Sequence, residues 1–242
     1  MLRNIIAIAF LFLLPAIAHC QKKDSVKTSK FALGIVFSPN SSYRNLSSDG
    51  SATASSIIRE RNTTEMPAFR WGFGASGTFE PVKGLVLSTG LIYSDRGYNT
   101  TSTTLYISSG RGLVKDGNNI FDYNYFYLDV PLMIGYELQA GKLHVGINGG
   151  LVVSLWLNST NTSIFTDTTG KTTTTVTNMD PVLRHGNFSL TANIKLSYDI
   201  TDNLYITLQP NYLQYIQPIV ADVPVSEYLY SFGLNAGVYY RF

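Results

Sequence analysis

The sequence predicts an all-β fold: an eight-stranded antiparallel up-and-down transmembrane β-barrel with short periplasmic turns and long extracellular loops. Three observations predict it. Apolar and polar residues alternate with a period of two in eight segments, and the connections between these segments are alternately short and long. No apolar run after residue 20 reaches the ~20 residues that a spanning helix needs. In a membrane, such strands satisfy their backbone hydrogen bonds only as a closed barrel.

The N-terminal residues 1–20 have the pattern of a secretory signal peptide. Arg3 supplies an early positive charge, an apolar run follows over residues 5–14, and small residues precede a cleavage site after Ala18 or Cys20. Lipidation of Cys20 is an alternative, whereas a membrane anchor is disfavoured because the run is too short. Residues 21–29 are expected to be a short periplasmic segment, and residues 30–242 the barrel. Since Cys20 is the only cysteine, no disulfide can form within the chain.

Eight segments carry the alternation, each at or beyond the ~9–11 residues that a tilted strand needs to cross a membrane. They are residues 30–38, 67–79, 84–98, 123–138, 143–157, 186–200, 203–216 and 228–242. The last segment alternates without a break, with Phe232, Leu234 and Val238 on one side and Ser231 and Asn235 on the other. Such a strand separates an apolar environment from a polar one.

Connections of two kinds join these segments. Turn-forming residues fill the short ones, at 80–83, 139–142 and 201–202. Polar residues fill the long ones, at 40–66, 99–122 and 158–185, and a shorter one at 217–227. The long connections are low in complexity, as in the Thr run at 172–175, and bury too little apolar surface to fold alone. We therefore expect them to be mobile, or ordered only against a partner.

Parity sorts the side chains of each strand into a lipid-facing set and an interior set. In the fifth strand, Leu143, Val145 and Ile147 face lipid, whereas His144 and Asn148 face inward. The same parity predicts an interior network of four bases and four acids: Arg70, Arg96, Lys195, Arg241, Glu80, Asp129, Glu137 and Asp199. These charges should pair, because an unpaired buried charge is costly. Side chains can fill a barrel of eight strands, so we expect a plugged polar core rather than an open pore.

Aromatic residues are expected to form belts at the two membrane interfaces. The periplasmic belt would contain Phe79, Tyr136, Tyr198, Tyr240 and Phe242, and the outer belt Phe69, Trp71, Tyr93, Phe126, Tyr212, Tyr228 and Tyr230. Trp156 lies near the outer end, but its parity points inward, so its assignment stays open. Pro131 and Pro210 cannot donate to a strand ladder, and we expect a bulge or local bend at each.

The composition favours a surface that faces lipid over one that faces water. Charged residues make up 14% of the chain, against about 25% in soluble domains, and aromatic residues make up 13%. The net charge of +2, with no basic cluster, argues against nucleic acid as a partner.

Signals for catalysis are weak. The chain has no Gly-x-Ser-x-Gly, His-Glu-x-x-His or phosphate-loop pattern. A nucleophile–base pair near the outer rim would have to come from His185, Ser189 and Asp180, a local cluster that follows no known pattern. We expect no catalytic residue, no cofactor and no metal site.

One stretch resembles a known family. It reads Tyr127-Leu128-Asp129-Val130-Pro131-Leu132 and is similar to a strand of the outer-membrane β-barrel family common in Bacteroidetes, often labelled porin-family or PorT-like. Residues 90–98 resemble the preceding strand of that family. The terminal Tyr240 and Phe242 resemble the assembly signal that the barrel-assembly machinery reads in such proteins. The resemblance covers essentially the whole mature chain. It implies the bacterial outer membrane, with both mature termini periplasmic, and is nearly silent on activity.

Three functions follow as hypotheses. The filled interior and the long loops favour a non-enzymatic structural or interaction subunit that docks with other envelope proteins in a larger outer-membrane complex. The alternative is a narrow channel or a conduit for small solutes or apolar ligands. The second alternative is an outer-membrane lipid-modifying enzyme. In each case the expected partners are outer-membrane lipid and, during biogenesis, the barrel-assembly machinery.

Overall fold

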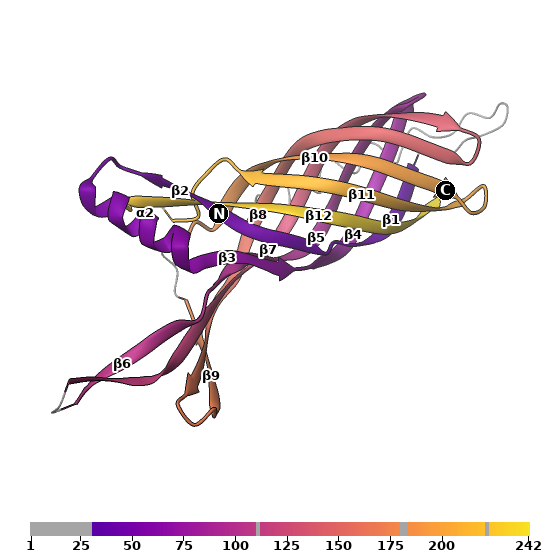
Figure 1. Cartoon of the computed structure of the whole chain (residues 1–242). Helices are drawn as coiled ribbons and strands as arrows, with labels where there is room; N and C mark the ends of the chain where they lie inside the picture. Colours follow the sequence, from indigo (N-terminus) through magenta and orange to yellow (C-terminus); the bar gives the residue numbers. More distant parts are fainter. Residues whose placement is uncertain (1–30, 110–111, 180–182, 221–222) are drawn as a thin grey trace, which may run out of the picture.

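The computed structural model describes residues 31–109, 112–179, 183–220 and 223–242; the predicted signal peptide at 1–20 and the segment 21–29 lie outside them. Figure 1 labels the elements that these residues form. The strands are β1 Phe31–Phe37, β2 Asn40–Ser48, β3 Glu65–Arg70, β4 Gly72–Val82, β5 Leu85–Thr100, β6 Thr103–Ser109, β7 Gly112–Ala140, β8 Leu143–Asp167, β9 Thr172–Asn178, β10 Gly186–Asp199, β11 Leu204–Tyr215 and β12 Val225–Arg241, and the helix is α2 Ala52–Thr64.

A closed ring of eight antiparallel positions forms the barrel wall. We call each position a stave; it holds either one strand or two strands that follow one another end to end. Going round the ring, backbone pairing joins β1, β4, β5, β7, β8, β10, β11 and β12 in turn, and β12 pairs again with β1. β2 prolongs the stave of β1 and β3 that of β4, since β2 pairs with β12 and β3. Staves that follow one another in the chain are neighbours in the ring, so the predicted all-β up-and-down fold is confirmed (Figure 1).

The two ends of the barrel differ. At one end, which we call the turn end, short connections join β4 to β5, β7 to β8 and β10 to β11. The first described residue and the C-terminal residue lie there too, because the N–H of Phe242 donates to the carbonyl of Phe31 over 3.1 Å. At the other end, the loop end, the long connections leave the ring. The predicted alternation of short and long connections is therefore confirmed.

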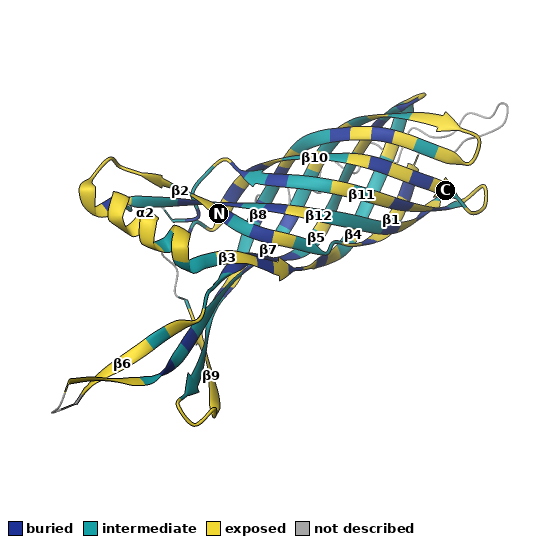
Figure 2. Cartoon of the chain, viewed as in Figure 1, coloured by how far each residue is buried: buried dark blue, intermediate teal, exposed yellow. Residues whose placement is uncertain are grey.

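Side chains alternate between the two faces of the wall, and Figure 2 shows the alternation as bands of exposed and buried residues along the barrel strands. In β8, Leu143, Val145 and Ile147 are exposed on the outside, whereas Asn148 and Ser154 are buried. β10 and β4 follow the parity that the sequence predicts in the same way. The outer surface of the ring is therefore apolar and its interior polar.

Aromatic side chains gather near both rims of this apolar surface. Towards the loop end, Trp71, Phe73, Tyr93 and Phe126 form a chain of rings with successive centroids 5.6 to 6.1 Å apart. At the turn end, Tyr240 and Phe242 pack edge to face at 5.1 Å.

Trp156 does not belong to the outer belt. It packs inward against the core at the loop end, and Leu157 beside it is exposed. The register of β7 with β8 shifts at Phe126 and Tyr127, where Tyr127 pairs with Trp156 and Phe126 with Asn158. Trp156 keeps the inward parity of the strand, and the extra residue, Leu157, reverses the parity after it, so that Ser159 is buried.

The long connections are folded, so the expectation of mobile loops is wrong for most of their length. β6 and β9 add to β7 and β8, which run on beyond the ring, and together they form a four-stranded sheet in the order β6-β7-β8-β9. We call this sheet the extension; it leaves the barrel obliquely (Figure 1). Low complexity did not prevent folding here, because the strands of the wall supply a template and Thr has a high β propensity.

The connection at 40–66 contains helix α2. The hydroxyl of Ser51 caps its first turn by accepting from the N–H of Ala54 over 3.1 Å. Ala54 is fully buried, and the chain returns to extended backbone at Glu65 to enter β3. Among the described residues, no helix is long and apolar enough to span a membrane.

The two prolines in the wall produce no bulge, so the prediction of a bulge is wrong, whereas that of a local bend stays a prediction. Pro131 pairs with Val152 in an unshifted β7–β8 register, and Pro210 pairs with Leu234 in β12. On the other side of each proline the pairing skips two positions and resumes in the same register. A proline lacks a donor on one side of its strand only, so a local gap suffices.

Replacing Gly97 by Ala should impair folding. Gly97 has φ 143°, and a Cβ there would overlap the carbonyl oxygen of Tyr123 in the neighbouring β7. We expect a loss of more than about 1 kcal/mol in the free energy of unfolding. Denaturation in detergent micelles, followed by the gel shift between folded and unfolded barrel, measures it. Gly186→Ala is the control, since a Cβ at Gly186 meets nothing within 4 Å; equal losses in both variants would contradict the steric argument.

Candidate functional site

Ion pairs close the barrel interior at the turn end. The ammonium of Lys195 lies 2.7 Å from the carboxylate of Glu137. Asp199 binds two partners, the guanidinium of Arg241 at 2.8 Å and Nε2 of His144 at 3.0 Å. The five side chains come from β7, β8, β10 and β12 and have the inward parity that the sequence assigns to them.

Two tyrosines reinforce this closure. Tyr205 and Tyr239 are buried and stack with ring centroids 5.1 Å apart and an interplanar angle of 11°. The guanidinium of Arg241 lies 4.3 Å from the centroid of Tyr205, within cation–π range. Ion pairs and the stacked rings of Tyr205 and Tyr239 therefore fill the interior at the turn end.

A second closure lies closer to the loop end. Arg96 and Asp129 form a buried ion pair at 2.5 Å. The remaining lone pairs and protons find partners too: Ser94 donates to Asp129 over 2.7 Å, and Arg96 donates to the hydroxyl of Tyr215 over 2.7 Å. A buried pair that is satisfied in this way is stable in place, although it contributes little net stability.

Between the two closures lies a small polar cavity of about 100 Å³. Its wall includes Asn148, Asn193, Asn211 and Asn235, which hydrogen-bond in pairs at 2.7 and 2.9 Å. The space suits roughly three water molecules at ~30 Å³ each. Arg96 and Asp129 border it on one side and Lys195 on the other. The interior is a plugged polar core, as the barrel diameter predicts.

Two residues of the predicted interior network have other neighbours. Arg70 is buried but pairs with Asp122 and lies 3.8 Å from Asp95, two acids that the sequence reading left out. Glu80 lies near the end of β4, and its carboxylate accepts from the N–H of Gly84 in the β4–β5 turn over 2.7 Å. A register shift between Phe79 and Val82 explains this, because it takes Glu80 out of the interior row.

A third set of charges holds α2 over the loop end. The guanidinium of Arg61 binds Glu65 at 2.6 Å and Glu227 at 2.7 Å, and it also donates to the hydroxyl of Tyr98 over 2.8 Å. Arg44 binds Glu65 from the other side at 2.6 Å. Burial opposes the charge of Arg61, but its bonds to Glu65 and its attraction to Tyr98 and Glu227 outweigh burial and raise its pKa.

We call α2 and its ion pairs among Arg44, Arg61, Glu65 and Glu227 the strap. An apolar and aromatic core lies under the strap. Its buried members are Tyr98, Tyr125, Tyr127, Val152, Leu183, Leu213, Tyr215, Ile219 and Leu229. They come from five staves and from both long connections that precede β10 and β12, so the loop end is packed shut.

Sequence reasoning missed the acids and bases of this end. Arg44, Arg61 and Glu65 lie in a stretch read as a loop, where parity has no meaning. Glu227 precedes the segment 228–242, and extending its alternation by one residue would have placed Glu227 with the interior set.

The residues considered for catalysis do not form a reactive pair. Ser189 is fully buried, and its hydroxyl donates to the carbonyl of Val152 over 3.4 Å. His185 packs edge-on against Trp156, and Asp180 lies outside the described residues. Within the described part of the chain, no group of three or more His, Cys, Asp or Glu is placed to hold a metal ion.

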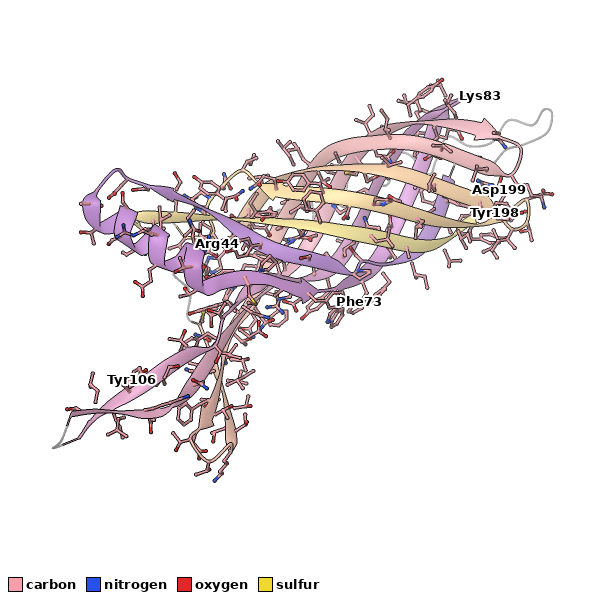
Figure 3. All side chains as sticks on the ribbon, in the orientation of Figure 1. Arg44, Phe73, Lys83, Tyr106, Tyr198 and Asp199 are labelled. Carbon is pink, nitrogen blue, oxygen red and sulfur yellow. The ribbon has the colours of Figure 1, made fainter. Side chains whose placement is uncertain are left out.

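The extension carries an exposed apolar group at its far tip. Leu113 is 74% exposed and Ile107 52%, and Leu105, Tyr106 and Val114 are exposed beside them on the same β6–β7 hairpin. Leu113 lies roughly 40 Å along β7 from Phe126 of the aromatic belt, at ~3.3 Å per residue. Figure 3 shows Tyr106 on this hairpin, well away from Phe73 and Tyr198 on the barrel wall. We call these five residues the apolar tip.

The β8–β9 hairpin beside it is polar. Its turn is held by Asp167, whose carboxylate accepts from the hydroxyl of Thr169 over 2.6 Å and from the N–H of Lys171 over 3.0 Å. These bonds to the charged form lower the pKa of Asp167.

Comparison with known proteins gives a family and a set of similar folds. The family model described as outer membrane protein beta-barrel domain matches residues 21–242. Neisserial surface protein A is similar in structure, with 14% sequence identity, a TM-score of 0.46 and coverage of 88% of this chain and 98% of that chain. OprG from Pseudomonas aeruginosa has 10% sequence identity and a TM-score of 0.45, with coverage of 88% of this chain and 96% of that chain. The outer membrane protease OmpT from Escherichia coli has 10% sequence identity and a TM-score of 0.42, with coverage of 91% of this chain and 99% of that chain. No curated protein matches the sequence.

Replacing Arg96 by Ala should destabilise the barrel strongly, because Asp129 is then left buried and charged without its partner. We expect a loss of about 3–5 kcal/mol in the free energy of unfolding, measured by urea denaturation in detergent micelles. The double variant Arg96→Ala/Asp129→Ala should regain part of this loss. A double variant that is no more stable than Arg96→Ala would show that the unpaired charge is not the cause.

Proposed function

The chain belongs to the outer membrane protein β-barrel domain family, and from this premise we propose that it is a non-enzymatic interaction protein. In this proposal the barrel is an anchor in outer-membrane lipid, and the extension is the part that docks with another envelope or surface protein, as a subunit of a larger complex.

The orientation belongs to the same proposal. The loop end, with α2 and the extension, faces outward, and the turn end with both mature termini faces the periplasm. The family and the apolar outer surface of the ring support an outer-membrane location. Short turns on the periplasmic side and long connections outside are the usual arrangement of such barrels. The PorT-like subgroup rests on the motif at residues 127–132 and stays a prediction.

The apolar tip is the observation that carries the proposal. Exposed apolar side chains on the barrel wall are explained by lipid, but the tip lies far beyond the aromatic belt, where lipid does not reach. Five exposed apolar or aromatic side chains on one short hairpin are a cost in water and are typical of an interaction site.

The closed interior supports an anchor rather than a conduit. Two layers of paired charges and the packed core at the loop end fill the barrel. The interior is therefore occupied by packed and paired side chains, and the outer surfaces and the extension remain available for recognition.

Biogenesis supplies one further expected partner. Tyr240 and Phe242 lie exposed on the outer face of the last stave, next to the seam where β12 pairs with β1. We propose that they are the residues that the barrel-assembly machinery reads, because they are accessible on β12 before the ring closes.

Replacing the tip residues should abolish docking without unfolding the barrel. The variant Ile107→Ser/Leu113→Ser/Val114→Ser removes apolar area that a partner would cover, so we expect the yield of crosslinked complex in outer membranes to fall about tenfold or more. Crosslinking in native membranes, followed by purification in mild detergent, measures the yield.

Lys115→Ala is the matched control, since Lys115 lies on the same hairpin and pairs with Tyr106. It should leave the complex intact. Recovery of the parent protein only as a monomer, in several mild detergents and after crosslinking, would count against the proposal.

A narrow channel is the second candidate, favoured by the small polar cavity between the two closures. In planar bilayers the parent should carry no steady current, because both ends of the cavity are closed. Arg96→Ala/Lys195→Ala removes one base from each closure and leaves Asp129 and Glu137 unpaired. The Asp199–Arg241 pair and the core at the loop end remain, so any current should be small and cation-selective. A steady current in the parent would favour the channel; no current in either protein would remove it.

A further inference from the structure

Strand β9 forms an edge of the extension. Its seven residues, Thr172–Asn178, pair with β8 in an unbroken antiparallel register from Thr166–Thr172 to Thr160–Asn178. Among the described residues, no strand pairs with the other side of β9 (Figure 1). Every side chain of β9 is exposed, so neither of its faces is covered.

The hydrogen bonds at the two ends of this hairpin show which backbone groups face outward. The N–H of Met179 donates to the carbonyl of Ser159 over 3.0 Å, and the N–H of Asp167 donates to the carbonyl of Lys171 over 3.0 Å. Bonded and non-bonded pairs alternate along an antiparallel ladder. Thr173, Thr175 and Thr177 therefore face β8, whereas the N–H and C=O groups of Thr172, Thr174, Val176 and Asn178 face away from it.

This edge has none of the features that usually block pairing. Soluble sheets protect their edges with proline, charged side chains or bulges. β9 contains no proline and no charged residue, and its register has no shift. The opposite edge differs, since the pairing of β6 with β7 is interrupted by a bulge at Leu105 and Tyr106. The barrel ring itself is closed. Among the described residues of the extension, the regular open edge is therefore specific to β9.

We propose that the β9 edge binds an extended segment of another protein chain, which adds to the extension as a fifth strand. The inference rests on the proposed interaction function and names the recognised chemistry: an extended backbone whose N–H and C=O groups match the free groups of Thr172, Thr174, Val176 and Asn178. The β-branched side chains of Thr174 and Val176 favour β-branched or aromatic neighbours across the new pair.

A second copy of this chain does not fit the edge. Two identical antiparallel strands are related by a twofold axis perpendicular to their sheet, whereas two copies in one membrane share an axis along the membrane normal. The extension continues β7 and β8 out of the barrel wall, so its strands rise from the membrane and the sheet cannot lie in the membrane plane (Figure 1). The two axes cannot coincide, so a second copy cannot add as an antiparallel strand, and we take a different chain as the partner.

The test uses a photo-crosslinking amino acid in place of Val176, in the full-length protein in native outer membranes. In that background, Thr174→Pro removes an outward N–H and leaves the bonds to β8 in place, because proline is tolerated on a free strand edge. Thr174→Val is the matched control, since it keeps the N–H and loses only the hydroxyl. We expect Thr174→Pro to lower the yield of adduct with another protein about tenfold or more, and Thr174→Val to leave it unchanged.

Hydrogen exchange of the purified variants checks that the hairpin persists, through the amides of Thr173, Thr175 and Thr177. With the hairpin intact, three results would overturn the inference: no adduct, an adduct with a second copy of this chain, or an adduct that Thr174→Pro does not reduce. Loss of the adduct in Thr174→Val would overturn it as well, since a hydroxyl and not the backbone would then be recognised.

A crosslinker at Leu113 separates this inference from the proposed function. An adduct from the apolar tip with none from β9 leaves the interaction function standing and removes the edge. Adducts from neither position remove both.

Discussion

The pairing of β1 with β12 is the contact on which the rest of the molecule depends. It joins the first and last staves through a register from Ala32–Arg241 to Phe37–Ala236. Without it, two strands of the wall would present unpaired backbone groups to hydrocarbon, where each costs several kcal/mol. Closure of the ring removes both edges at once, and this allows the outer surface to be apolar.

Closure of the ring also determines which side chains can occupy the interior. A ring of eight staves leaves a narrow space that long charged side chains can cross, provided that glycine makes room on the wall. Gly135, Gly146 and Gly150 lie where a Cβ would collide with the neighbouring stave or its side chains. The charges that enter this space must pair, and they do so in layers: Lys195 with Glu137, and Arg96 with Asp129.

The sequence allowed the wall to be predicted closely, because a period of two is imposed on each strand by lipid on one side and the polar core on the other. The predicted parity of β8 and the inward position of Arg241 and Asp199 follow from that rule alone. The rule fails where the register shifts: the extra residue Leu157 reverses the parity of the rest of β8, and a shift between Phe79 and Val82 takes Glu80 out of the interior row. The rule does not apply outside the wall, because no strand there separates lipid from a polar core. It therefore predicts neither α2 nor the ion pair of Arg61 with Glu227.

The extension differs in one respect from a loop that is merely attached to a barrel. β7 runs for 29 residues and β8 for 25, each as one continuous strand from the turn end into the extension. A pulling force on the extension would pass along these strands into the wall, parallel to the strand axes. Under such shear, many backbone hydrogen bonds share the load together instead of opening one after another. The extension and the barrel wall therefore share two strands, so a force applied to the extension is carried by the hydrogen-bonded wall of the barrel.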